Sequence, residues 1–299
     1  MATARGFFGY LKPEIGDGVS AFAVNVAMPL LLFRTMVGAN FHGAAPWAFW
    51  SVYFAAAIVA WTVGHLITTR IFGRDSQAGL VGGVSSAFSN IVLLGIPFII
   101  GVLGQPGFEI LSLLVSIHLP IMIMASIVLF EIFGGSGKTM QPMRILGTFV
   151  NRVATNPLIV AIVGGQIWRL TGIPLPALPM RLVDALADTA GPVALFAIGL
   201  NLSRFGLSGN VRPAFVLSGV KLLLMPAVAL ALAWMAGLPP LTAKVAVAAA
   251  ALPSGVNSYL IAVQFNTGQA LASNQMTIST ACAAFTTALW LSLAQIVFG

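Results

Sequence analysis

From Val245 to its last residue the chain contains no Asp, Glu, Lys, Arg or His. A soluble domain needs charged side chains on its surface, and about 25% charged residues is typical. Here only 7% of the residues are charged and 59% are apolar. This composition excludes an ordinary soluble domain, and we predict an all-α polytopic membrane protein.

A helix crosses the hydrocarbon core of a bilayer with about 20 mainly apolar residues. Apolar stretches that are candidate spans occur along the whole chain, with short connections between most of them. They are Gly18–Val37, Ala45–Thr68, Gln77–Leu103, Phe108–Phe133, Thr155–Leu170, Leu182–Ser203, Pro213–Met235, Leu241–Phe265 and Ala270–Phe298.

The net charge is +7, yet the Lys and Arg residues form no patch that would bind nucleic acid. In short loops these residues favour the cytoplasmic side of the membrane. Nine of them fall on the side that holds the N-terminal segment and the loop 134–154, and four fall on the other side. We expect a bacterial inner-membrane protein with a cytoplasmic N-terminal segment and a periplasmic C-terminus.

Two of the apolar stretches are interrupted by Pro and Gly. The first break runs from Ser89 to Pro97, and the second runs from Leu252 to Tyr259. A break leaves backbone N–H and C=O groups that hydrocarbon cannot satisfy, so it persists only where protein buries it or where it lines a polar cavity. Interruptions in corresponding places of two halves indicate the binding site of a secondary transporter. The alternative is that Pro97 and Pro253 make ordinary kinks, which membrane helices tolerate.

The two halves of the chain are related by a nearly constant offset. Pro29 and Pro192 lie 163 residues apart, and Ser89 and Ser254 lie 165 residues apart. We therefore interpret residues 1–133 as a first repeat, 134–154 as a cytoplasmic linker and 155–299 as a second repeat. The first repeat has four candidate spans and the second has five. We expect an inverted-repeat transporter fold of the 5+5 type, here 4+5, in which the first helix is missing.

Several motifs occur in the same order as in a known family. The chain resembles the auxin efflux carrier family of permeases, which includes bacterial malonate and malate carriers. The resemblance covers nearly the whole chain and rests on Ala27–Phe33, Ser89–Pro97, Asn156–Leu158, Gly191–Gly199 and Ala251–Asn257. It implies ten helices, with the fourth and ninth crossing at their breaks. It also implies a scaffold (here about 18–37 and 155–203), a mobile transport domain (about 45–133 and 213–299) and a homodimer formed through the scaffold.

Crossed breaks would bring helix ends of both kinds to one point near the midplane of the membrane. The N-terminal end of a half-helix presents free N–H groups and suits an anion, whereas a C-terminal end presents carbonyls and suits a cation. The amides of Asn90 and Asn257 can donate to a carboxylate. The residues that we expect to bind the substrate are Ser89, Asn90, Gly95, Pro97, Pro253, Ser254, Gly255, Asn257 and Tyr259.

Three ionisable side chains are candidates for coupling transport to H⁺ or Na⁺, namely His118, Asp188 and Lys221. Ionisable groups inside a membrane are rare and often functional. Each candidate also has a structural interpretation. A neutral His118 would bond a backbone carbonyl, Asp188 would lie with Asp184 on a hydrated interfacial face, and Lys221 would extend to the cytoplasmic surface.

The function that these features favour is secondary transport of a small organic anion by alternating access, probed best with malonate, malate or auxin-like carboxylates. The alternatives are a sodium-coupled bile-acid-type symporter, a non-transporting membrane sensor and an intramembrane enzyme. No zinc, phosphate-loop or nucleophile-elbow motif occurs, so we expect no enzyme, no metal site and no cofactor.

Overall fold

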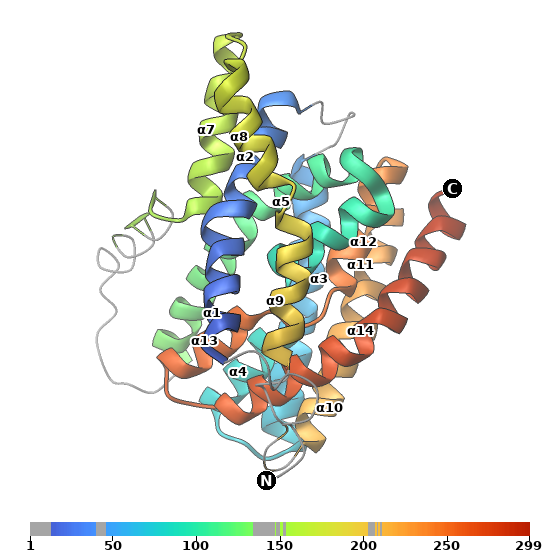
Figure 1. The fold of residues 1–299 in the computed structure, drawn as a ribbon. Helices are drawn as coiled ribbons and strands as arrows, with labels where there is room; N and C mark the ends of the chain where they lie inside the picture. Colours follow the sequence, from blue (N-terminus) through green and yellow to red (C-terminus); the bar gives the residue numbers. More distant parts are fainter. Residues whose placement is uncertain are drawn as a thin grey trace.

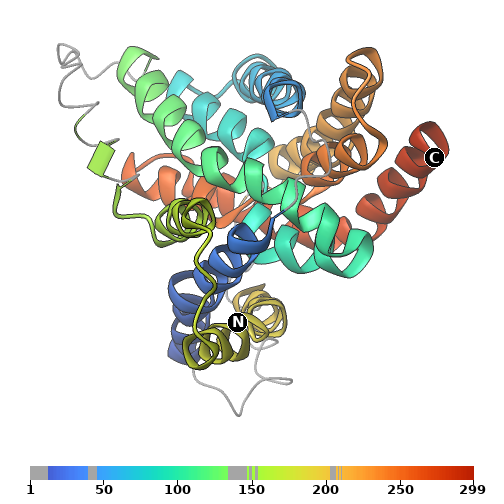
Figure 2. The same cartoon turned by 90° about the horizontal axis from the view of Figure 1, so that it is seen from above.

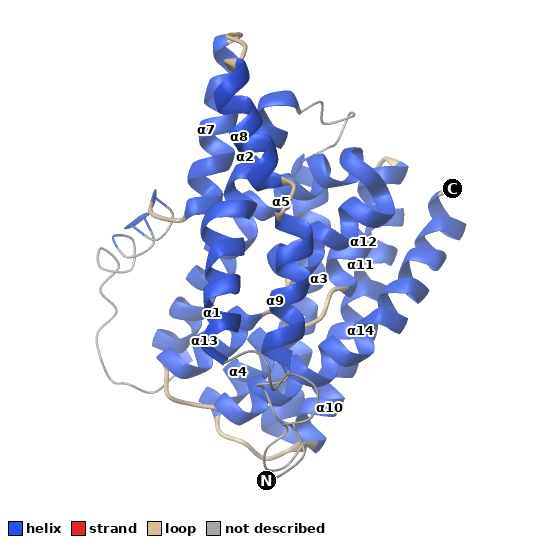
Figure 3. Cartoon of the chain, in the orientation of Figure 1, coloured by secondary structure: helices blue, strands red, loops and turns tan. Residues whose placement is uncertain are grey.

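The computed structural model of the chain describes residues 13–39, 46–133, 147, 150–151, 154–202, 207, 209 and 211–299. Across these ranges the regular structure is helical, and the one β feature is an isolated antiparallel bridge (Figure 3). Five helical runs are long and apolar enough to cross a membrane: Ile15–Gly38, Pro46–Ile71, Ile91–Phe133, Arg212–Met235 and Gln269–Phe298. The predicted all-α polytopic fold is confirmed. Most of the expected linker, 134–154, lies outside the described residues.

The remaining predicted spans are built from shorter helices. One consists of α4 (Ser76–Ala87), the π-helical turn η3 (Ile91–Gly95) and the start of α5 (Ile96–Phe133), and another consists of α12 (Pro240–Ala251) and α13 (Val256–Gln264). A third, α7 (Pro157–Thr171), is a single short apolar helix. The expected span Leu182–Ser203 differs from the structure, where α8 (Ala177–Ala187) and α9 (Ala190–Leu202) are separate helices.

Helix α5 contains the end of one predicted span and the whole of the next. Its 38 residues would extend about 57 Å if straight, roughly twice the thickness of the hydrocarbon core. The chain turns at Gly104, whose φ of 65° and ψ of −168° are not helical. Only glycine adopts such a conformation without strain. The turn lies between Leu103 and Phe108, where the sequence predicted the end of one span and the start of the next.

Prolines explain three of the wide helical turns. The π-helical turns η1 (Ala23–Ala27), η3 and η4 (Val220–Leu224) each end two residues before a proline, namely Pro29, Pro97 and Pro226. A proline lacks an N–H and clashes with the carbonyl four residues earlier. A widened turn relieves that clash while the helix continues. These prolines therefore modify the helices locally and do not end them.

The helices pack into two groups (Figures 1 and 2). In the first group, α2 (Met28–Gly38) packs on α7 and α8, and α1 (Pro13–Phe22) packs on α9. The second group contains the two broken helices together with α3 (Pro46–Leu66), η2 (Ile67–Ile71), α10 (Arg212–Gly219), η4, α11 (Met225–Met235) and α14 (Gln269–Phe298). Figure 2 shows the first group gathered on one side of the molecule, where η3 and α5 meet α7 and α9.

Small residues let the helices of the second group approach closely, as is common in membranes. A Cβ atom on Gly82 would lie 2.0 Å from Oγ1 of Thr68, and one on Gly64 would lie 2.8 Å from the carbonyl oxygen of Gly82. These glycines therefore set the distance between α3 and α4. The residues from Val245 to Ala251 in α12 are all buried, and most of them are alanine.

Candidate functional site

The two helix breaks meet and pair through their backbones. The N–H of Asn90 donates to the carbonyl oxygen of Pro253 at 2.9 Å, and the N–H of Gly255 donates to the carbonyl oxygen of Phe88 at 2.8 Å. These two bonds form the isolated antiparallel bridge between Ser89 and Ser254. Each break thus satisfies backbone groups of the other at a depth where water is scarce. Pro253 lies in the second break and not in a kinked continuous helix, whereas Pro97 lies in a helical run beyond the first break.

Glycines permit this close crossing. A Cβ atom on Gly95 would lie 2.6 Å from Cδ1 of Leu252. A Cβ atom on Gly255 would lie 3.2 Å from the carbonyl oxygen of Ser89, which is backbone and cannot move aside easily. Both positions are buried. Their role in this structure is to bring the two chains together at the bridge.

A cavity of about 300 Å³ lies against the crossing. Its wall combines both breaks with residues of the first helix group. The lining residues are Val24, Asn25, Ser89, Asn90, Ile91, Val92, Leu93, His118, Leu119, Asn156, Pro157, Leu158, Gly255, Val256, Asn257 and Leu260. No charged side chain is among these residues. The volume is at the small end of the range of ligand pockets.

Three helices begin at this cavity, so their N-termini face it. They are the start of η3 at Ile91, the start of α13 at Val256 and the start of α7 at Pro157. The first N–H groups of a helix have no acceptor within the helix, and the helix dipole places partial positive charge there. The cavity therefore carries a positive potential from the backbone, although its side chains are neutral.

Side-chain amides add further donors. Asn25, Asn90 and Asn257 line the cavity, and their amide groups have no hydrogen-bond partner among the residues that the structure describes. Asn156 uses its Oδ1 to accept from the N–H groups of Leu158 and Ile159, at 2.9 and 3.3 Å. This N-cap leaves the amide nitrogen of Asn156 as a donor.

The two serines at the bridge are part of the protein's own hydrogen-bond network. The hydroxyl of Tyr53 donates to Oγ of Ser89 at 2.9 Å. Oγ of Ser254 lies 3.1 Å from Oγ of Ser258, and the N–H of Ser254 donates to Oγ of Ser279 at 3.1 Å. These contacts hold the extended backbone of the breaks in place.

The structure brings only part of the predicted substrate site to the cavity. Ser89, Asn90, Gly255 and Asn257 line it. The predicted residues that are not among the lining residues are Gly95, Pro97, Pro253, Ser254 and Tyr259. Asn25 and Asn156 were not predicted. Asn156 directly precedes Pro157, and Asn25 is a polar residue in an apolar segment four residues before Pro29.

His118 is the predicted coupling residue that lies at the cavity. The side chain is 4% exposed, and its Nε2 is buried without a hydrogen-bond partner in the described structure. The ring packs edge-on against Phe88 and Tyr53, with centroid distances of 4.8 and 5.5 Å. Nε2 therefore bonds no backbone carbonyl among the described residues.

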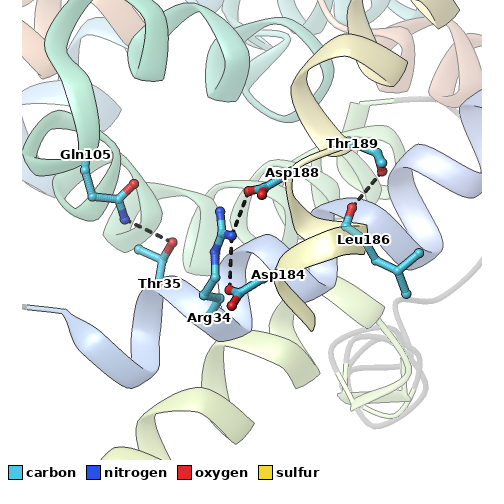
Figure 4. Close-up of polar contacts among 7 residues, drawn as sticks. All are labelled: Arg34, Thr35, Gln105, Asp184, Leu186, Asp188 and Thr189. Carbon is cyan, nitrogen blue, oxygen red and sulfur yellow. Dashed lines mark hydrogen bonds and ion pairs between the residues drawn. The ribbon is translucent and has the colours of Figure 1, made fainter. Parts of the chain in front are cut away.

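Asp188 lies elsewhere. Nη1 of Arg34 in α2 contacts the carboxylates of Asp184 and Asp188 at 3.2 and 2.7 Å (Figure 4). Figure 4 also shows Nε2 of Gln105, which follows the turn in α5, donating to Oγ1 of Thr35 at 3.3 Å. The Asp188 side chain is 70% exposed. It therefore ties α8 to α2 within the first helix group.

Lys221 is wholly buried in η4, so it does not extend to the surface as one interpretation held. Its Nζ donates to the carbonyl oxygen of Ala250 at 2.7 Å and to the sulfur of Met225 at 3.2 Å. It is not among the residues that line the cavity. Within the described ranges, no group of three or more His, Cys, Asp or Glu side chains is placed to hold a metal ion.

Comparison with known proteins agrees with this architecture. A family model described as a membrane transport protein matches residues 3–291. The chain belongs to this family of membrane transport proteins. It is the auxin efflux carrier family, to which the sequence motifs pointed.

This family member is similar to proteins from distant organisms. It is 24% identical to a Rhizobium meliloti protein named "Putative malonate transporter", over 92% of this chain and 88% of that protein. It is 25% identical to an "Uncharacterized transporter" of Methanothermobacter thermautotrophicus, over 94% of this chain and 90% of that one. It is 23% identical to auxin efflux carrier component 8 of Arabidopsis thaliana, over 85% of this chain and 83% of that protein. This carrier-family protein is thus a membrane transporter.

Proposed function

We propose that the chain is a secondary transporter of a small organic anion, a mono- or dicarboxylate, that works by alternating access. The observation that carries the proposal is that three helix N-termini and three amides meet at one small cavity. Among the described residues these amides have no partner, and no charged side chain lines the cavity. N–H groups in the first turns of η3 and α13 and the side-chain amides can donate hydrogen bonds to a carboxylate. The N–H groups of Leu158 and Ile159 at the start of α7 already donate to Asn156. A cation would meet positive dipole ends in the same place.

The position of the cavity supports a moving-group mechanism. One wall is formed by the crossed breaks of the second helix group, and the other wall is formed by η1 and the start of α7 in the first group. A solute held between two bodies is exposed to one side or the other when one body moves along its partner. We therefore assign residues 18–37 and 155–203 to a static scaffold, and 45–133 and 213–299 to the transport domain that moves.

The names of two similar proteins favour a carboxylate. Malonate and auxin, the solutes in those names, each carry a carboxylate group. The cavity volume of about 300 Å³ favours a small solute over a bulky one. The runner-up, a sodium-coupled bile-acid-type symporter, would require a larger ligand and a cation site.

We further propose a bacterial inner-membrane location with the chain's C-terminus in the periplasm. The distribution of Lys and Arg between the two sides supports this orientation. The start of α1 and the end of α14 lie at opposite ends of the molecule in Figure 1, as an odd number of crossings requires.

Uptake into proteoliposomes tests the proposal. Radiolabelled malonate, malate, pyruvate and indole-acetate are offered separately to the reconstituted chain, with empty liposomes as the blank. We expect at least one carboxylate to accumulate, and unlabelled malonate but not neutral malonamide to compete with it. Competition by malonamide as strong as that by malonate would show that the site does not select an anion. Uptake that stops in the absence of Na⁺ would favour the symporter.

A further inference from the structure

Lys221 is a buried amine next to the crossing, and it does not line the anion cavity. Its exposed fraction is 0%, and it lies in η4, in the middle of the helical run Arg212–Met235. Among the residues that the structure describes, Lys221 forms no ion pair. A buried ammonium without a carboxylate partner is costly unless other groups satisfy it.

The hydrogen-bond acceptors of Lys221 Nζ place it at the C-terminal end of α12. Nζ donates at 2.7 Å to the carbonyl oxygen of Ala250, the residue before the last residue of α12. The last carbonyls of a helix have no partner within it and carry the negative end of the helix dipole. Ala250 and Ala251 are fully buried, so these carbonyls depend on the protein for a donor. The second contact, Met225 Sδ at 3.2 Å, is a weak neutral acceptor.

Transporters with broken helices use such carbonyl ends to coordinate a coupling cation. Here an ammonium of the chain itself contacts the carbonyl end of the half-helix that leads into the second break. We propose that Lys221 is a resident cation at the carbonyl end of α12, that it replaces a coupling cation there, and that transport needs no Na⁺ at this position.

The internal repeat shows that this arrangement belongs to one half only. The 165-residue offset that aligns Ser254 with Ser89 aligns Lys221 with Ala56, a buried residue of α3. The carbonyl end of α4 therefore receives no ammonium from the equivalent position. In its ammonium form Lys221 would offset the charge of a monovalent anion bound at the crossing while the transport domain moves.

The inference rests on the proposed function for its uptake measurements but not for its stability measurements, which need no substrate. In detergent, the thermal midpoint of Lys221→Ala is measured in choline, Na⁺, ethylammonium and neutral n-propanol, at equal ionic strength for the salts. We expect a midpoint several degrees below that of the original chain in choline. Ethylammonium or Na⁺ should restore part of it, and n-propanol should not. Lys244→Ala, in α12 but away from its carbonyl end, is the control and should show no cation dependence.

Restoration by n-propanol as large as that by ethylammonium would mean that Lys221 only fills space, and would overturn the proposal. The proposal would also be overturned if Lys221→Ala had the same thermal midpoint as the original chain and if that midpoint did not change with the added cation. If Lys221→Ala does not fold, Lys221→Met keeps the volume without the charge. It should lose malonate uptake, whereas the original chain should take up malonate equally in Na⁺ and choline. Uptake by Lys221→Met equal to the original, or uptake by the original that requires Na⁺, would contradict the inference.

Discussion

The backbone N–H of Asn90 donates to the carbonyl oxygen of Pro253, 163 residues away along the chain, at 2.9 Å. The reciprocal bond from Gly255 to Phe88 completes the bridge. Neither break could close into a regular helix without leaving backbone groups of the other unpaired in a buried site. The two breaks therefore depend on each other. The cavity beside them requires that both segments stay non-helical.

Replacing Gly255 by alanine should damage the crossing. The new Cβ would lie 3.2 Å from the backbone oxygen of Ser89 and 3.4 Å from the backbone of Asn90. Overpacking of this kind costs about 1–3 kcal/mol, so we expect a lower thermal midpoint and loss of uptake. Gly101→Ala in α5 is the matched control, because nothing lies within 4 Å of its Cβ position. Equal midpoints for the two variants would show that the bridge tolerates a wider separation.

Removing the amides at the cavity should weaken binding without unfolding the protein. Asn90→Ala and Asn257→Ala each delete an amide that has no partner in the described structure. A hydrogen bond to a charged group contributes about 1.5–3 kcal/mol, so malonate affinity should fall roughly 10- to 100-fold. Isothermal titration and thermal midpoints measure the two effects separately. Asn90→Asp, which keeps the size and adds a negative charge, should bind more weakly than Asn90→Ala.

Asn156 should separate helix capping from ligand binding. Its Oδ1 caps α7 by accepting from Leu158 and Ile159. Asn156→Asp keeps the cap, while Asn156→Ala loses it at a cost of about 1 kcal/mol. We expect Asn156→Asp to retain the original thermal midpoint but to lose affinity for malonate at least as strongly as Asn156→Ala, because its carboxylate repels the anion. Unchanged affinity in Asn156→Asp would place the solute away from α7.

His118→Phe should distinguish a ligand-binding role from a packing role. Phenylalanine can keep the edge-on contacts with Phe88 and Tyr53 and removes a buried nitrogen that has no partner. The thermal midpoint should therefore stay the same or rise. If the imidazole contacts the solute, affinity for malonate should fall about 10-fold, the loss of roughly 1.4 kcal/mol. A variant with original uptake would show that the ring serves packing alone.

Asp188→Asn should leave transport intact. The ion pair with Arg34 is 2.7 Å long, but the carboxylate is 70% exposed, and exposed ion pairs contribute about 0–1 kcal/mol. We expect a small change in midpoint and unchanged malonate uptake, with Arg34→Gln behaving in the same way. A stable Asp188→Asn variant without uptake would instead support a proton-relay role.

The sequence carried most of the information about the fold because the bilayer limits the choices. Apolar length predicted the spans, and the Pro and Gly in Ser89–Pro97 and Leu252–Tyr259 predicted breaks that the structure shows at Phe88–Asn90 and Leu252–Gly255. The extent of the first break was overestimated. Gly95 and Pro97 lie in helical turns after it, because a widened π turn accommodates the proline without unwinding the chain.

The composition of the cavity could not be predicted from the breaks alone. Asn25 and Asn156 come from the other helix group, and no local pattern states which helix faces which across a membrane protein. The environment of Lys221 could not be predicted either. Whether its side chain is buried or reaches the surface depends on how α12 and α14 pack around η4. Such tertiary contacts join residues that the sequence places far apart.

The contacts of Arg34 and Gln105 have different consequences for movement. The ion pairs from Arg34 join helices of one group, whereas the bond from Gln105 to Thr35 joins one group to the other. If the groups slid past each other, the ion pairs of Arg34 would stay intact. The hydrogen bond from Gln105 to Thr35 would break, and water would hydrate both side chains. In the proposed movement, the contacts of Arg34 and Gln105 would therefore oppose sliding with one neutral hydrogen bond and with no ion pair.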